Sequence, residues 1–398
     1  MPMLAKLVHD YSGDPVLPER QLPEGDDPWG VIAQKGQFQG TPAEKLSEIC
    51  GRICYDSFGK GRDSKAYHDH ILEVNHGSVY EHFNYTVLIV LDGDRFTAEL
   101  LTILANRPGV WLEFEHNTVR ITLNLRSTVE WHRWSRHAGF TADSTLGDLA
   151  RNVGARIRTV ANKLAPQVVR LGTDDEYQCA LVVELVQALH QEEQGVSMVM
   201  GGSRGFSHEL VRHGDRTAIS QRSTRYVDED GSEYVTHPLL TAYCEDPEAT
   251  INYMMEQCEY DEAAVAEVRA SIEKALVVMH KSTEADREAY RAIVEGMQPW
   301  LVSQGADKFT ARKQARGAAR GFLGNALYTE MVFSASVAQW HRIFRQRCGL
   351  AADAEIREIG CQALRAIKES QYGYRFENWD LQEDHLGWFG VEREEVTA

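Results

Sequence analysis

The chain has 398 residues, 43% of them hydrophobic and 25% charged, as expected for a folded protein with one or two domains and a full core. Its formal net charge of −17 argues against nucleic acid or an anionic membrane as the main partner. The longest apolar runs are too short to span a bilayer, and the first 20 residues lack the apolar stretch of a secretory signal. Seven scattered cysteines indicate reduced thiols in a cytoplasmic protein, and no Cys or His spacing predicts a metal site.

The first 92 residues begin with a segment, 1–40, rich in Pro, Gly and Asp, which we expect to be irregular. Helices are predicted at 44–57 and 65–74. Residues 83–91 are rich in β-branched and aromatic side chains, which favours a strand.

Residues 93–200 are expected to form an embedded, mainly helical module. Its predicted elements are an extended stretch at 117–125, a helix beginning near Ser127, a loop at 139–147 and helices at 148–171 and 175–193.

Residues 201–398 are predicted to be mostly helical. The expected elements are a loop at 198–204, a strand at 328–336, and helices at 207–213, 249–297, 308–323, 337–347 and 352–371. The sequence therefore divides into 1–92, 93–200 and 201–398, and it predicts a mixed α and β protein.

Residues 212–226 hold four arginines, a histidine, two serines and a glutamine. The guanidinium fork of arginine binds phosphate at two points, and serine hydroxyls can complete such a pocket. Two interpretations stay open for the segment alone: a solvated basic loop, or a site for a nucleotide phosphate.

Two further patterns involve charged or metal-binding types of side chain. Arg312, Arg316 and Arg320 recur every fourth residue and share one helix face, which is either a solvated basic stripe or an anion contact at Arg320. His208 and His213 are five residues apart, so they do not share a helix face as the histidines of a zinc protease must.

Four blocks in order resemble the flavin-dependent thymidylate synthase family. Residues 76–82 are similar to its His-x-Ser-Val-x-Glu-His block, and 207–227 to its signature, usually Arg-His-Arg followed seven or eight residues later by Ser. Residues 312–326 are similar to its Lys-Gln-Ala-Arg block, and 340–357 to its closing helices. The resemblance covers about 42–92 and 201–372.

The resemblance implies an α/β (α+β) fold in which helices flank a sheet, assembled as a homotetramer with shared active sites. It implies C5-methylation of dUMP to dTMP with FAD, NADPH and methylenetetrahydrofolate, a chemistry in which no enzyme cysteine attacks the base. Two alternatives stay open: methylation of UMP (or of both nucleotides) in a nucleoside-antibiotic pathway, and a non-catalytic or RNA-binding relative.

Carried over residue by residue, the resemblance assigns Arg347 to stabilising negative charge on the uracil ring. The residues it assigns to the nucleotide are Glu209, Arg212, Gln221, Ser223, Thr224, Arg225 and Arg320. Those it assigns to the flavin are His76, Ser78, Glu81, Arg212 and His213.

The chain departs from the family pattern at two places. The third residue of the Arg-His-Arg triplet is Gly214, unless Arg216 takes that role. The family's late Asn-x-Arg flavin contact is replaced by Ser336-Val337-Ala338. We hypothesise that Asn124 and Arg126 supply the lost flavin contacts; the alternative is a helix cap and a surface arginine.

Overall fold

The protein is described by a computed structural model, which covers residues 3–9, 38–58, 61–90, 110–115, 118–130, 182–186, 195–214, 217–257, 260–384 and 387–393. The predicted loop at 139–147 and helix at 148–171 lie outside these residues, as do Arg216 and most of the segment expected to be irregular.

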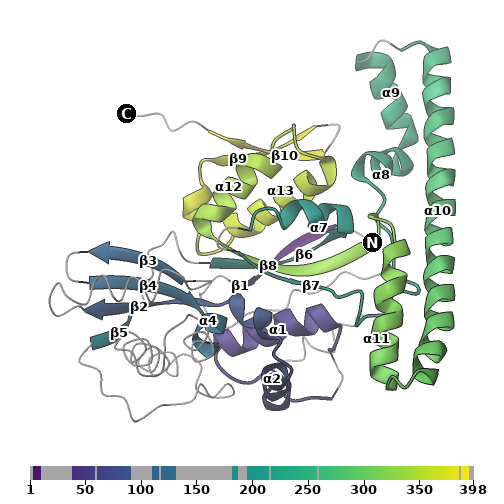
Figure 1. The fold of residues 1–398 in the computed structure, drawn as a ribbon. Coiled ribbons are helices and arrows are strands. Elements are labelled where there is room, and N and C mark those ends of the chain that lie inside the picture. The colour runs from purple at the N-terminus through teal and green to yellow at the C-terminus, as the bar shows by residue number, and fades with distance from the viewer. Residues whose placement is uncertain are drawn as a thin grey trace.

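The central sheet has four antiparallel strands in the order β1-β6-β8-β7 (Figure 1). They are β1 (Leu4–His9), β6 (Gly195–Ser203), β8 (Tyr328–Ser336) and β7 (Thr217–Gln221). The strand β8 confirms the prediction for 328–336. Two expectations were wrong: β1 lies in the segment expected to be irregular, and β6 includes most of the expected loop at 198–204.

The glycines at 201 and 202 suggested that loop, but their role is close packing. A Cβ atom on Gly202 would lie 2.7 Å from Ile359 Cδ1, so the missing side chain lets a helix approach the strand. All nine residues of β6 are buried. A strand covered on both faces lacks the polar alternation that would have identified it.

Helices cover both faces of this sheet (Figure 1). One face carries α7 (Arg204–Leu210), α12 (Val337–Arg347) and α13 (Ala354–Lys368), and α1 (Pro42–Tyr55) packs on the other. Successive strand residues point to opposite faces. In β8, Met331 and Phe333 therefore join the larger core, while Val332 joins the smaller one with α1.

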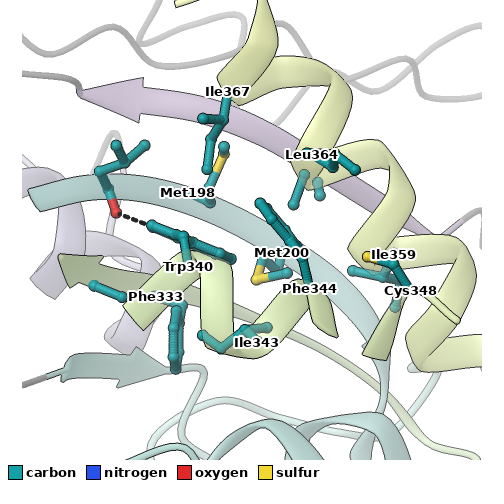
Figure 2. Close-up of a cluster of buried hydrophobic side chains, with 14 of the residues drawn as sticks. Met198, Met200, Phe333, Trp340, Ile343, Phe344, Cys348, Ile359, Leu364 and Ile367 are labelled. Carbon is teal, nitrogen blue, oxygen red and sulfur yellow. Dashed lines mark hydrogen bonds between the residues drawn. The ribbon is translucent and has the colours of Figure 1, made fainter. Parts of the chain in front are cut away.

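The larger core lies between the sheet and α12 and α13 (Figure 2). Trp340 is fully buried there and donates its indole N–H to the Val196 carbonyl at 3.1 Å. Phe344 stacks on Trp340, with ring centroids 5.5 Å apart. This packing fixes α12 on the sheet, and with it the position of Arg347 at the end of the helix.

The first helices confirm their predictions. A capping box at Thr41 begins α1, and Asp63 caps α2 (Ser64–Glu73), which leads into the 3-10 helix η1 (Gly77–Glu81). Gly51 of α1 lies against Tyr67 of α2, where a Cβ atom would be 1.7 Å from the phenolic oxygen.

A second antiparallel sheet has the order β3-β4-β2-β5. Its strands are β2 (Asn84–Val90), β3 (Val110–Glu115), β4 (Thr118–Asn124) and β5 (Val182–Val186), and β4 runs into the short helix α4 (Leu125–Val129). The predicted helix at 175–193 is wrong for residues 182–186, which pair with β2 instead.

A helical arm stands beside the central sheet (Figure 1). It consists of α8 (Pro238–Glu245), α9 (Pro247–Gln257), α10 (Glu262–Ser303), α11 (Lys308–Ala319) and the 3-10 turn η2 (Arg320–Phe322). The single helix expected at 249–297 is therefore two. The buried Tyr290 of α10 ties the arm to the body, because its hydroxyl accepts from the Glu229 amide at 3.2 Å.

After α13 the chain forms the 3-10 turn η3 (Gly373–Phe376) and a hairpin of β9 (Trp379–Asp384) and β10 (Gly387–Glu392). Within the described residues, no helix has both the length and the apolar character needed to cross a membrane.

Candidate functional site

Arg347, Glu209 and His213 come together from separate elements. Arg347 ends α12, Glu209 lies on α7, and His213 follows that helix. The Arg347 guanidinium donates from Nη1 to Glu209 Oε2 at 2.6 Å and from Nε to His213 Nε2 at 2.9 Å. The fold thus brings residues predicted from two separate blocks into one cluster.

His213 accepts from a cation in this cluster, so its Nε2 carries no proton. Burial and then the Arg347 charge lower the pKa of the imidazole, which keeps the ring neutral. Gln339 also donates its side-chain amide to the His213 carbonyl at 3.4 Å. The neutral ring and the Glu209 carboxylate fix the orientation of a guanidinium whose side chain remains 20% exposed.

Gln221 ends β7 and is held by two hydroxyls. Its side-chain nitrogen donates to Ser207 Oγ at 3.0 Å and to Thr329 Oγ1 at 3.2 Å. Ser207 lies on α7 and Thr329 on β8. The two hydrogen bonds therefore fix the end of β7 to this helix and to this strand.

The next residues form a tight turn. The Ser223 carbonyl accepts from the amides of Tyr226 and Val227, and the Ser223 amide donates to the Cys54 carbonyl at 2.9 Å. Thr224 is buried, while Arg225 is exposed beside Gly317 of α11. The turn therefore presents an arginine at the surface from an anchored backbone.

A cavity of about 630 Å³ adjoins this turn. Its described lining combines aromatic and cationic groups and contains no carboxylate. The lining residues are Arg52, Tyr55, Ser57, Arg62, Tyr67, His70, Ile71, Val74, His76, Tyr226, Phe309 and Lys313. We call it the α1–α11 cavity.

The cavity wall is ordered by contacts between its own rings. Tyr55 Oη lies 2.7 Å from His76 Nδ1, and the Tyr226 ring packs edge-on against Tyr55 at 5.1 Å. The Lys313 ammonium lies 4.8 Å from the centroid of the Tyr226 ring. Burial and then the Lys313 charge lower the pKa of His76, so its ring is neutral at neutral pH. Within the described residues, the buried Ser57 hydroxyl has no hydrogen-bond partner.

Arg204 is a functional candidate that the sequence analysis missed. It is the first residue of α7. Burial lowers its pKa, the negative charge of Glu229 opposes this shift, and the positive charge of Arg320 adds to it. Two neighbouring arginines that share a single carboxylate are suited to a further anion. The segment 198–204 was expected to be a loop, so nothing in its pattern placed Arg204 next to Arg320.

Glu81 and Arg126 form an ion pair between η1 and α4. Arg126 also donates to Glu130 at 2.9 Å, and its side chain is 37% exposed. Asn124 accepts from the Ser127 amide at 2.7 Å, which is the helix-cap role kept open as the alternative. The proposed flavin role of Arg126 and Asn124 stays a prediction, but the fold does bring Arg126 to the predicted flavin block.

The remaining predicted residues lie at the surface. Ser78 of η1 and Arg212 after α7 are both exposed. Arg216, the alternative to Gly214, lies outside the described residues.

Ser336 stands in place of the asparagine of the family's late flavin contact. Its hydroxyl accepts from the Gln339 amide at 3.1 Å, so this residue is the N-cap of α12.

Residues 191–370 match the sequence profile of a family described as "Thymidylate synthase complementing protein". The chain is 31% identical over 177 residues to the flavin-dependent thymidylate synthase of Mycolicibacterium gilvum, covering 44% of this chain and 58% of that protein. It is 32% identical over 171 residues to the same enzyme of Mycobacteroides abscessus, covering 43% and 56%. The chain therefore spans just over half the length of these relatives.

Proposed function

We propose that this chain, whose residues 191–370 belong to the thymidylate synthase complementing protein family, methylates C5 of a uridine nucleotide, converting dUMP to dTMP. The proposed cofactor is FAD, the reductant is NADPH, and the carbon donor is methylenetetrahydrofolate. The observation that carries the proposal is the guanidinium of Arg347, held between Glu209 and His213.

The residues around the α1–α11 cavity fit a planar, negatively charged group. Aromatic side chains offer stacking surfaces, the cations offer ion pairs, and no carboxylate among the lining residues that the structure describes repels an anion. The unpartnered Ser57 hydroxyl adds a hydrogen-bonding group. FAD, a nucleotide and a folate each combine a planar ring with negatively charged phosphate or carboxylate groups. When bound, the reduced flavin supplies the electrons of the reaction.

The chain's own residues would bind and polarise the nucleotide. Arg225 and the Arg204–Arg320 pair supply fixed positive charge for a phosphate. Arg347 would stabilise negative charge that develops on the uracil ring, as a preoriented donor does in oxyanion-type catalysis. Among the described cysteines, Cys50, Cys348 and Cys361 are buried, and burial raises the pKa of Cys50, Cys54 and Cys348. The thiols of Cys50, Cys54 and Cys348 are therefore poor nucleophiles, which supports a methylation that needs none.

The first test is the cofactor. The purified full-length protein should show flavin absorbance near about 375 and 450 nm, or gain it on addition of FAD. A protein that neither contains nor takes up FAD would instead support the non-catalytic or RNA-binding alternative.

The second test is the substrate. dUMP and UMP are compared under identical conditions with methylenetetrahydrofolate and NADPH, and methylated product is measured by mass spectrometry. We expect dTMP to form faster. A strong preference for UMP would replace dUMP by the alternative substrate, and a requirement for another reductant would remove NADPH.

We further propose a homotetramer with shared sites. Light scattering at several protein concentrations tests the assembly, and a monomeric protein with full activity would contradict it.

A further inference from the structure

One face of α10 contacts both segments that carry exposed arginines of the proposed phosphate site. Arg225 lies in the tight turn formed by residues 223–227, which we call the phosphate turn. Arg320 begins η2, directly after α11. The helices α10 and α11 pack side by side, and α10 also packs against η2 (Figure 1). The arm therefore lies where it can fix the positions of both arginines.

Asp286 of α10 holds the chain at the end of η2. Its Oδ2 accepts from the Gly324 amide at 2.9 Å. The neighbouring Leu323 amide donates to the Arg320 carbonyl at 3.3 Å. The two hydrogen bonds connect the carboxylate on α10 to the backbone of the arginine, so Asp286 limits how far Arg320 can move.

The close approach at this contact depends on the missing side chain of Gly324. A Cβ atom there would lie 2.8 Å from Asp286 Oδ2, which is closer than Cβ atoms come to other atoms in folded proteins. The backbone can therefore come near enough for its amide to reach the carboxylate. A carboxylate accepts a stronger hydrogen bond from an amide than a neutral oxygen does.

The same face of α10 also holds the chain that leaves the phosphate turn. Tyr290 follows Asp286 by one helical turn, and its hydroxyl accepts from the Glu229 amide at 3.2 Å. From α11, Arg316 donates to the Tyr226 carbonyl at 2.7 Å. The phosphate turn and η2 are thus both tied to one pair of helices.

We propose that Asp286 is a positioning residue of the nucleotide site, which holds η2 through the Gly324 amide so that Arg320 meets the nucleotide phosphate from a fixed backbone. This role rests on the proposed function, in which Arg320 is a phosphate contact. Without the carboxylate, the nucleotide itself must order η2 when it binds, and the entropy lost in that ordering reduces the affinity.

The test measures dUMP binding to the full-length protein by isothermal titration calorimetry, with FAD in excess. Asp286→Ala should weaken binding by about three- to tenfold, the ratio that corresponds to one hydrogen bond. Asp286→Asn keeps an acceptor oxygen for the Gly324 amide and should bind dUMP nearly as well as the parent protein. Glu267→Ala removes the same charge from an exposed position on α10, so it is the matched control and should bind normally.

A role that acts through Arg320 also predicts coupling between the two residues. Arg320→Gln alone should weaken dUMP binding, and adding Asp286→Ala should then change the affinity by less than about twofold. A merely structural change would instead add its full loss. Turnover of Asp286→Ala at saturating dUMP should stay within about twofold of the parent, because the hydrogen bonds of Arg347 go to Glu209 and His213, outside the arm.

The outcomes separate this role from the function on which it rests. If the parent protein does not bind dUMP at about 1 mM, or if Arg320→Gln binds it as tightly, the proposed nucleotide site is wrong and Asp286 has no phosphate contact to position. If Arg320→Gln weakens binding and Asp286→Ala does not, only the positioning role is overturned. Additive losses, or an equal loss for Glu267→Ala, overturn it as well. Should Asp286→Ala fail to fold, Gly324→Ala carries the same test, since its methyl group displaces the carboxylate from the amide.

Discussion

At the scale of single residues, the orientation of Arg347 is set by partners from another helix. Two of its guanidinium nitrogens donate to Glu209 and His213, yet the side chain is still 20% exposed. A cation held in this way needs little reorganisation when charge develops beside it. Replacing Arg347 should therefore affect catalysis more than folding.

We predict that Arg347→Gln lowers the methylation rate by about 10²–10³-fold, the usual effect of removing one preorganised donor. Circular dichroism and FAD content should remain close to wild type. Arg269→Gln, a fully exposed change on α10, is the matched control and should keep full activity. A turnover within threefold of wild type for Arg347→Gln would remove it from the catalytic role.

His82 is the second residue whose surroundings determine its chemistry. It is buried against the central sheet, with Nδ1 2.8 Å from Ser334 Oγ of β8 and Nε2 2.9 Å from Ser220 Oγ of β7. Burial lowers its pKa to about 3, so the folded protein holds the neutral ring. The pKa of His68 is likewise lowered, to about 4.

These shifts predict acid sensitivity with a definite sign. Between about pH 6.5 and the lowered pKa, the unfolded chain binds a proton at His82 and the folded chain does not. Stability should therefore fall as pH drops through this window, by about 1.4 kcal/mol per pH unit for a histidine of this kind. Urea unfolding from pH 7 to pH 5 measures the slope. His82→Gln should unfold at lower urea at pH 7 and show a shallower slope; equal slopes would contradict the buried neutral histidine.

At the scale of elements, the pair α1 and α2 depends on one close approach. Tyr67 is buried, and its hydroxyl lies against Gly51 of α1 without a hydrogen-bond partner in the described part of the chain. The ring is held from another side by Arg52, whose guanidinium carbon lies 4.9 Å from its centroid. These two helices form part of the α1–α11 cavity wall, so their spacing also shapes that cavity.

We predict that Gly51→Ala destabilises the protein by about 1–3 kcal/mol, the usual cost of overpacking, because the new methyl group would meet the Tyr67 hydroxyl. Tyr67→Phe alone should be nearly neutral, since that hydroxyl has no partner to lose. The double variant should recover most of the loss. Denaturant unfolding of the four proteins measures the coupling, and strictly additive effects would argue against the contact.

At the scale of the whole molecule, the second sheet is joined to the predicted flavin block. Arg126, which follows β4 of the second sheet, pairs with Glu81 of η1. A partly exposed ion pair contributes little to stability by itself. Its role here is positional, because it ties the end of β4 to η1, which packs against α1 and against β7 of the central sheet.

We predict that Arg126→Ala weakens FAD binding, measured by titration of flavin fluorescence, while thermal unfolding of the flavin-free protein changes little. Arg120→Ala, on β4 of the same sheet, is the control and should bind FAD normally. Unchanged FAD affinity for Arg126→Ala would favour the alternative of a surface arginine beside a helix cap.

Much of this architecture follows from local sequence. The helix predicted at 337–347 has those bounds, because Ser336 caps it and its apolar residues follow a helical period. The strand at 328–336 was likewise confirmed. The blocks that hold Arg347, Glu209 and His213 were identified from residue order alone, and the fold unites these three.

Only the tertiary structure decided the rest. The strand β6 was missed because its glycines serve the approach of α13, and β5 because its partner β2 lies about a hundred residues earlier in the chain. Arg204 near Arg320 and the walls of the α1–α11 cavity likewise bring distant segments together. Caps and periodicity act within a few residues, so the sequence shows them directly. Close packing, burial and shared charge depend on which segments meet, and only the folded chain brings those segments together.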